Sequence, residues 1–109
     1  MNRIASFLTL MFLVAVTFTW QMPTTNEDGS PLTDLAGARI YCGQEAGVHS
    51  LLVDAGNVTT YTDTTLPEGV TQYCVGTAYD TSGNEGAKSN ELFFTPRVAP
   101  GVLIDFQKL

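Results

Sequence analysis

The side chains in this sequence that could do chemistry are two cysteines and one histidine. Cys42 and Cys74 lie 32 positions apart, and His49 is the only histidine. A zinc site needs several closely spaced cysteine or histidine ligands, and no CxxC motif is present. The chain therefore lacks enough soft ligands for zinc, and its cysteines form either a disulfide or a pair of buried thiols.

No other group of residues has the spacing of a catalytic, metal-binding or phosphate-binding motif. His49 has no GxSxG or comparable partner, and no glycine-rich phosphate loop occurs. The acidic NEDGS stretch at residues 26–30, with Asp34 nearby, lacks the DxDxDG spacing and the distal glutamate of a calcium loop, which favours a turn stabilised by Asx side chains. Asn57 begins an NVT glycosylation sequon, which matters only in a eukaryotic secretory pathway. We therefore predict a non-enzymatic protein without a cofactor.

The composition favours one small domain built from short strands. The chain has 109 residues with ten Gly and five Pro, and Thr and Val are abundant, which is typical of strands separated by turns. The net charge is −6, and the five basic residues are scattered. This argues against a nucleic-acid partner, because phosphate contacts need clustered Lys and Arg.

The start of the chain resembles a secretory signal in some respects. The apolar run over residues 4–16 follows Arg3, has the length of a signal core and is too short to span a bilayer comfortably. A cleaved signal would bring the chain to a membrane only transiently. The cleavage site is poor, however, because cutting after Ala15 leaves the bulky Leu13 three positions back, and cutting after Val16 leaves a branched residue at the bond.

The other interpretation, which we favour, is that residues 1–15 are retained as structure. Val16, Phe18 and Trp20 alternate with two threonines, as in a half-buried strand with its large side chains on one face. This strand follows the apolar run without a linker.

Further along the chain, strand-like segments are separated by turn-forming residues. Residues 21–38 contain Pro23, Gly29 and Pro31, which rule out regular structure there. About seven short strands at near-regular spacing are typical of a β-sandwich or barrel. The expected strands are residues 16–20, 38–43, 48–54, 57–63, 71–79, 89–96 and 102–106.

Three of these stretches together resemble a fibronectin type III domain, of the compact single-domain type seen in bacterial secreted proteins and phage-encoded proteins. They are VTFTW, PTTNEDGSPLTDLAGARIYCG and LPEGVTQYCVGTAYDTSGNEGAKSNE. The resemblance implies an all-β, two-sheet Greek-key sandwich, immunoglobulin-like, with no active site of its own. It divides the chain into an apolar N-terminal segment (1–15), the domain (16–96) and a C-terminal extension (97–109).

The resemblance also implies a core, and one that is underfilled. Gln72, Cys74 and Gly76 would face inward with Ala78, at positions where the family places bulkier side chains. Because a void costs stability in proportion to its volume, a disulfide, the apolar residues 4–14 or a neighbouring chain must fill the space. The expected core residues are Val16, Phe18, Trp20, Ile40, Leu66 and Ala78.

On the same resemblance, Cys42 and Cys74 face inward on antiparallel neighbouring strands. Opposed Cβ atoms on such strands lie about 4.5–5.5 Å apart, slightly beyond the usual disulfide spacing of about 3.5–4.5 Å. We therefore expect the two side chains to be in contact. A formed bond and a pair of packed thiols are both consistent with the sequence.

The opposite face of those strands is expected to carry an aromatic patch. A contiguous apolar patch indicates an interface, unless the tail or the first segment folds back over it. The strand-like extension adds a second apolar segment. The candidate interface residues are Tyr41, Tyr73, Val75, Tyr79, Val102, Leu103, Ile104 and Phe106.

These features favour a structural or interaction module. The leading hypothesis is a phage virion component, a capsid decoration or tail-associated protein, whose partners are other protein subunits present in many copies. It would act in assembly, stabilisation or surface adhesion. The alternative is a secreted or periplasmic bacterial adhesion module that contacts carbohydrate through Tyr41, Tyr73 and Tyr79. A third hypothesis is an accessory domain of an enzyme.

Overall fold

Runs rich in Val, Thr and aromatic residues form strands that are separated by glycine-containing turns. The computed structural model describes residues 14–105, 107 and 108, and over that part of the chain it contains strands and no helix, so it holds no helix able to cross a membrane. The strands are β1 (Val16–Thr19), β2 (Leu35–Glu45), β3 (Val48–Gly56), β4 (Thr60–Asp63), β5 (Gln72–Asp80) and β6 (Leu92–Phe94).

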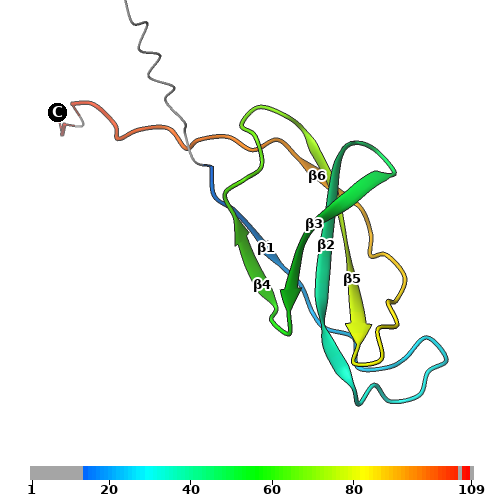
Figure 1. The fold of residues 1–109 in the computed structure, drawn as a ribbon. Coiled ribbons are helices and arrows are strands. Elements are labelled where there is room, and N and C mark those ends of the chain that lie inside the picture. Colours follow the sequence, from blue (N-terminus) through cyan, green and yellow to red (C-terminus); the bar gives the residue numbers. More distant parts are fainter. Residues whose placement is uncertain (1–13, 106, 109) are drawn as a thin grey trace, which may run out of the picture.

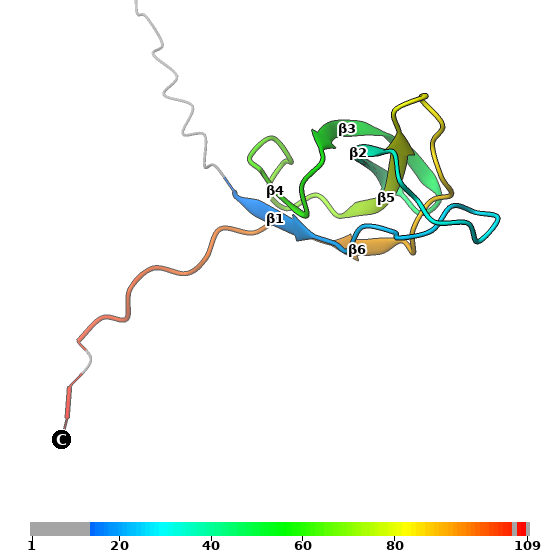
Figure 2. The ribbon, with the colours of Figure 1, turned by 90° about the horizontal axis from the view of Figure 1, so that it is seen from below.

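The six strands form two antiparallel sheets that pack face to face (Figure 1). β1 pairs with β4, and the larger sheet has the order β3-β2-β5-β6. Seen from below, β1 and β4 lie on one side of the sandwich, and β6 lies close to β1 (Figure 2). The predicted all-β, two-sheet sandwich is confirmed, but it has six strands rather than about seven.

The missing strand is the one expected at residues 102–106. Residues 102–105 lie outside any strand, and Phe106 lies outside the described residues. The tail runs away from both sheets, so its backbone has no neighbouring strand to supply hydrogen bonds (Figures 1 and 2). Asp105 has a positive φ of 54°, which ends the extended backbone at residue 104. Strand-like composition alone was therefore a wrong guide here.

The strand expected near the end of the domain is shorter in the structure, and the apolar start lies mostly outside the described residues. The strand expected at residues 89–96 is reduced to β6, because Ser89 uses its backbone N–H and its hydroxyl to bind Gly76 before regular pairing begins. The two interpretations of the apolar start, residues 1–15, fall mostly on residues 1–13, which lie outside the described residues.

The core lies between the sheets and is centred on the two cysteines. Phe18, Ile40 and Leu66 are buried with them, and Val16 and Trp20 are partly buried against this cluster. Ala78, expected in the core, is only half-buried. It lies on the part of β5 that β6 does not reach, since β6 pairs only with residues 72–74.

Cys42 and Cys74 are directly opposed in the β2–β5 ladder and are joined by a disulfide. Their Cα atoms are 4.2 Å apart, near the spacing of the closer kind of antiparallel pair. The bridge occupies the space left by the small side chains of the inner face. By the chain-entropy model, a loop of this length contributes about 3–4 kcal/mol to the free energy of unfolding.

Asp63 and Gly43, which lie outside the core cluster, also stabilise the fold. The carboxylate of Asp63, which is 2% exposed, accepts hydrogen bonds from the backbone N–H groups of Thr65 and Leu66 at 2.7 and 2.9 Å. This turn at the end of β4 places Leu66 in the core. Gly43 is required where β2 meets β3, because a Cβ there would lie 1.8 Å from the carbonyl oxygen of Val48.

Candidate functional site

The face of the larger sheet that points away from β1 and β4, here called the outer face, carries the predicted aromatic patch. Strand alternation places Arg39 and Tyr41 of β2 on this face, because Ala38, Ile40 and Cys42 point into the core. In the ladder, Arg39 lies between Asp54 of β3 and Thr77 of β5. The register therefore brings a cation, a carboxylate and a hydroxyl into one row.

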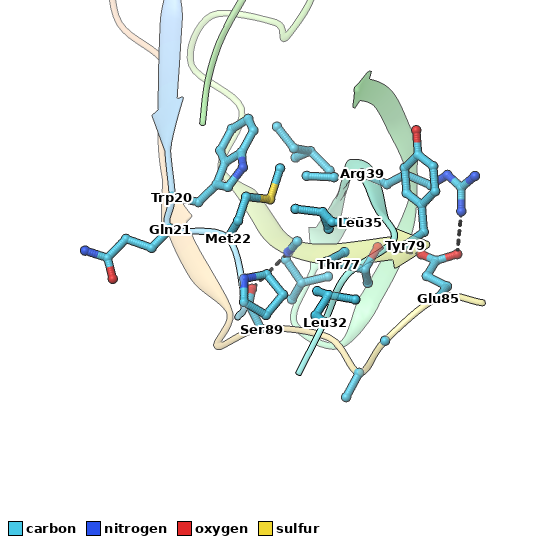
Figure 3. Close-up of a pocket in the computed structure, with 18 of the residues that line it drawn as sticks. Trp20, Gln21, Met22, Leu32, Leu35, Arg39, Thr77, Tyr79, Glu85 and Ser89 are labelled. Carbon is cyan, nitrogen blue, oxygen red and sulfur yellow. Dashed lines mark hydrogen bonds and ion pairs between the residues drawn. The ribbon is translucent and has the colours of Figure 1, made fainter. Parts of the chain in front are cut away.

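Arg39 is the centre of a polar network on the outer face. Its Nη1 lies 3.0 Å from Oε1 of Glu85, and its Nε lies 3.4 Å from Oδ2 of Asp54. Its guanidinium also stacks over the ring of Tyr79, 3.9 Å from the ring centroid. Figure 3 shows Arg39 beside Tyr79 with the ion pair to Glu85. A planar guanidinium can make all three contacts at once, which a lysine could not.

Glu85 comes from the connection between β5 and β6 and folds back over the sheet. The backbone N–H of Gly86 binds the carbonyl of Ala78 at 2.8 Å, which holds the connection against β5. The carboxylate of Glu85 accepts a hydrogen bond from Thr77 Oγ1 at 2.6 Å and another from the hydroxyl of Tyr41. The bond from Thr77, followed by those from Tyr41 and Arg39, lowers the pKa of Glu85. The bond to Glu85 raises the pKa of Tyr41.

Tyr79 completes the network through Asp54. Its hydroxyl donates to Asp54 Oδ1 at 2.6 Å, which lowers the pKa of Asp54 and raises that of Tyr79. The ring lies across Gly37 of β2, where a Cβ would come within 2.7 Å of the tyrosine oxygen. Glycine at this position lets the phenol lie flat on the sheet.

A second glutamate from the same connection binds His49. Glu91 Oε2 lies 2.5 Å from Nε2 of His49 and accepts the backbone N–H of Gly47 at 2.8 Å. The bond from Gly47, followed by that from His49, lowers the pKa of Glu91. The single histidine is thus used to attach the connection to β3. The described residues hold no group of three or more His, Cys, Asp or Glu that could bind a metal.

The outer face is therefore not the open aromatic patch that the sequence predicts. Val75 is 5% exposed, and the hydroxyls of Tyr41 and Tyr79 are bound to carboxylates. Among the described residues, the β5–β6 connection lies over this face, because its Glu85 binds Tyr41 and Thr77. Tyr73 stays at the surface in a tilted pair with Phe93 of β6, with ring centroids 5.8 Å apart. Phe93 is 72% exposed, and the sequence analysis did not identify it.

Beside the half of β5 that β6 does not reach is a hollow of about 960 Å³ (Figure 3). One wall is the turn-rich segment after β1, which contributes the apolar side chains of Trp20, Met22 and Leu32. The indole nitrogen of Trp20 is buried and has no hydrogen-bond partner among the residues that the structure describes. Opposite lie Thr77 and Glu85, whose polar atoms are already bound in the network. The hollow can hold an apolar group, and the polar atoms of Thr77 and Glu85 on its wall serve the fold.

The edges of β1 and β6 face each other across a narrow groove of about 450 Å³, here called the β1–β6 seam. It is lined by residues 14–19 of one sheet and by Leu92 and residues 94–97 next to the other. Across the described residues, no backbone hydrogen bond joins β1 to β6. The predicted interface residues Val102, Leu103 and Ile104 lie beyond the seam, in the exposed tail.

The strand arrangement can be compared with solved structures. A fibronectin type III domain of the human KIAA0970 protein superposes with a TM-score of 0.63, covering 83% of this chain and 69% of its own. The sixth fibronectin type III domain of human fibronectin type III domain containing protein 3 superposes with a TM-score of 0.60. The match covers 84% of this chain and 79% of that domain's chain. This chain has the fibronectin type III fold. Sequence identities of 20% and 21% mean that the likeness concerns the fold alone.

The same fold occurs within a larger enzyme. A β-1,2-glucanase from Parabacteroides distasonis matches with a TM-score of 0.63 and 20% identity over 81% of this chain, but the chain spans only 12% of that protein. No protein-family model matches the sequence, and no curated protein matches it.

Three residues of this site were not identified from the sequence, namely Phe93, Glu85 and Glu91. Phe93 points to the opposite face from the partly buried Phe94, so its exposure follows once the strand phase is known. Glu85 and Glu91 carry no local signal for their partners Arg39 and His49, which lie 46 and 42 positions away in the sequence. Their roles depend on the path of the connection.

Proposed function

We propose that this fibronectin type III fold is a non-enzymatic interaction module that acts as a subunit of a multi-copy assembly. The proposal rests on where its exposed apolar side chains lie. Phe93 is on β6, and Val102, Leu103 and Ile104 follow on the tail that leaves from β6, each more than two-thirds exposed. Monomeric proteins rarely expose clustered apolar side chains unless a partner covers them.

The polar residues of the domain support an interaction role. In the outer-face network each carboxylate accepts hydrogen bonds from tyrosine, threonine or arginine side chains that also hold the sheet together. His49 is bound to Glu91 and is almost fully buried. General acid–base chemistry needs a titratable group directed at a substrate, and these groups are directed at each other.

The assembly that best suits these features is a virion. A small acidic sandwich with an apolar tail is soluble as a domain and loses its exposed apolar surface when neighbouring subunits cover it. As a capsid decoration or tail-associated protein, the chain would act in assembly, stabilisation or surface adhesion. The pair of half-buried Tyr73 and exposed Phe93 favours a second candidate, a secreted or periplasmic bacterial module that adheres through this aromatic surface.

The test compares the incorporation of a tail variant and a control variant into particles. Wild-type chain should be found in many copies in purified virions, by quantitative mass spectrometry. A variant with Val102, Leu103 and Ile104 changed to Ser should fold normally but be lost from the particles. The control is Val48→Ser, which removes an exposed valine from β3 and should be incorporated as wild type. Wild-type chain found only free in the medium, with its N-terminus shortened, would favour the secreted module instead.

A further inference from the structure

β1 is an edge strand with one hydrogen-bonded partner. It pairs with β4 over its full length, from Val16 opposite Asp63 to Thr19 opposite Thr60. Within residues 14–105, no strand pairs with its other edge. The N–H and C=O groups on such an edge are a template for another extended segment.

The groove beside this edge is apolar and suits an alternating strand. Val14 and Phe18 are buried, Val16 is half-buried, and the residues between them point to solvent. Across the seam, Phe94 contacts Phe18 edge to face, with ring centroids 5.7 Å apart. An added strand would therefore place every second side chain over apolar surface and leave the others in water.

The tail has the complementary features. Val102 and Ile104 fall on one side of an extended segment and Leu103 on the other, by the alternation of a strand. Val102 is 93% exposed and Ile104 is 88% exposed. Residues 101–104 match the four-residue length of β1. The tail points away from its own seam, so it is presented to another molecule rather than to its own domain (Figure 2).

We propose that the tail of one copy of this chain adds as a strand to the β1 edge of a second copy. An antiparallel alignment would set Ile104 opposite Val16 and Val102 opposite Phe18, with both tail side chains in the seam. The chain carries both the donor segment and the acceptor edge, which is why the occupant is a second copy. The contact is head-to-tail, so it produces open chains or closed rings of subunits, of which a reciprocal exchange between two copies is the smallest. This proposal names the partner in the assembly and rests on the proposed function.

The test measures the mass of the full-length chain in solution as its concentration rises. Wild type should form species of increasing mass in sedimentation or light-scattering experiments. Ile104→Lys should weaken association by about tenfold or more, because its charge would be buried in the seam. Leu103→Lys adds the same charge one residue away on the exposed side, and it should associate like wild type.

A synthetic peptide of residues 98–109 provides a second measurement that needs no tail in the acceptor. It should break up wild-type assemblies and bind the Ile104→Lys protein at one peptide per chain. Equal effects of the two lysine substitutions would overturn the proposal, and so would a wild-type chain that is monomeric and binds no peptide. The latter result would leave the proposed function intact if the chain were still found in virions, bound there to a different protein.

Discussion

The outer face of the larger sheet and the β1–β6 seam at the edge of the sandwich differ in how their polar and apolar groups are used. On the outer face, Glu85 and Glu91 fold back from the β5–β6 connection and bind Arg39, Tyr41 and His49. At the seam, β1 has an unpaired edge over the described residues, and the tail keeps its apolar side chains in solvent.

The difference indicates which side is built for the domain itself and which for a partner. Groups that bind each other within the chain contribute to the free energy of unfolding and leave little for another molecule. An unpaired edge and an exposed apolar segment contribute little to the isolated domain and gain free energy only on association. Substitutions on the two sides should therefore affect different measurements.

The largest expected effect on stability is at the disulfide that joins β2 and β5 on the core side of the larger sheet. Changing Cys42 and Cys74 together to Ser should lower the free energy of unfolding by about 3–4 kcal/mol, because the unfolded chain loses its cross-link. Chemical denaturation with urea measures this loss. If the two sides are independent, the variant should still associate at temperatures where it is folded. A protein whose stability is unchanged by the double substitution would contradict the placement of the bridge.

A smaller effect distinguishes two tyrosines of the predicted patch. Tyr79→Ser should cost about 1–2 kcal/mol, because it removes a hydrogen bond to the charged Asp54 and the ring that stacks on Arg39. Tyr73→Ser should lower the free energy of unfolding by only about 0.5 kcal/mol. The aromatic partner of Tyr73 is Phe93, which is itself exposed. Thermal unfolding of the two variants measures the contrast. Equal costs would mean that the network does not stabilise the sheet.

The pH dependence of stability provides a third comparison. The folded pKa of Glu85 lies below its unfolded value, so its contribution is present above about pH 4.3 and is lost as the pH falls through the folded pKa. Glu85→Gln cannot titrate and should lose less stability between pH 6 and pH 3 than wild type. The control is Glu45→Gln, an exposed glutamate at the end of β2. A steeper acid loss in Glu85→Gln than in wild type would contradict the network.

The smallest expected effect is on the stability of the tail variants. Ile104→Lys and Leu103→Lys should each change the free energy of unfolding of the monomer by less than about 0.5 kcal/mol, because both side chains are exposed. Dilute samples in which the chain is monomeric are the condition for this measurement. A large loss in either variant would mean that the tail packs on its own domain.

The sequence predicts those parts of the molecule that depend on local alternation. The phase of β2 follows from Ala38, Ile40 and Cys42 at every second position, whereas the phase of β5 is implied by the resemblance to fibronectin type III domains. Together the two phases bring Cys42 opposite Cys74. Residues 102–105 show the limit of this reasoning, because a strand also needs a partner, and its own domain supplies none. The bonds of Glu85 to Arg39 and Tyr41 could not be predicted either, since Glu85 reaches them along a connection whose path is set by tertiary contacts.

The most direct test of the contrast between the two sides is hydrogen exchange at the backbone amides of β1, measured on the full-length chain at low and at high concentration. We expect the β1 amides that face away from β4 to exchange rapidly in dilute solution and to become protected as the chains associate. The amides of β5 should be protected at both concentrations. Protection of β1 that is already complete in dilute solution, or that stays absent at high concentration, would contradict an edge that another copy of the chain covers.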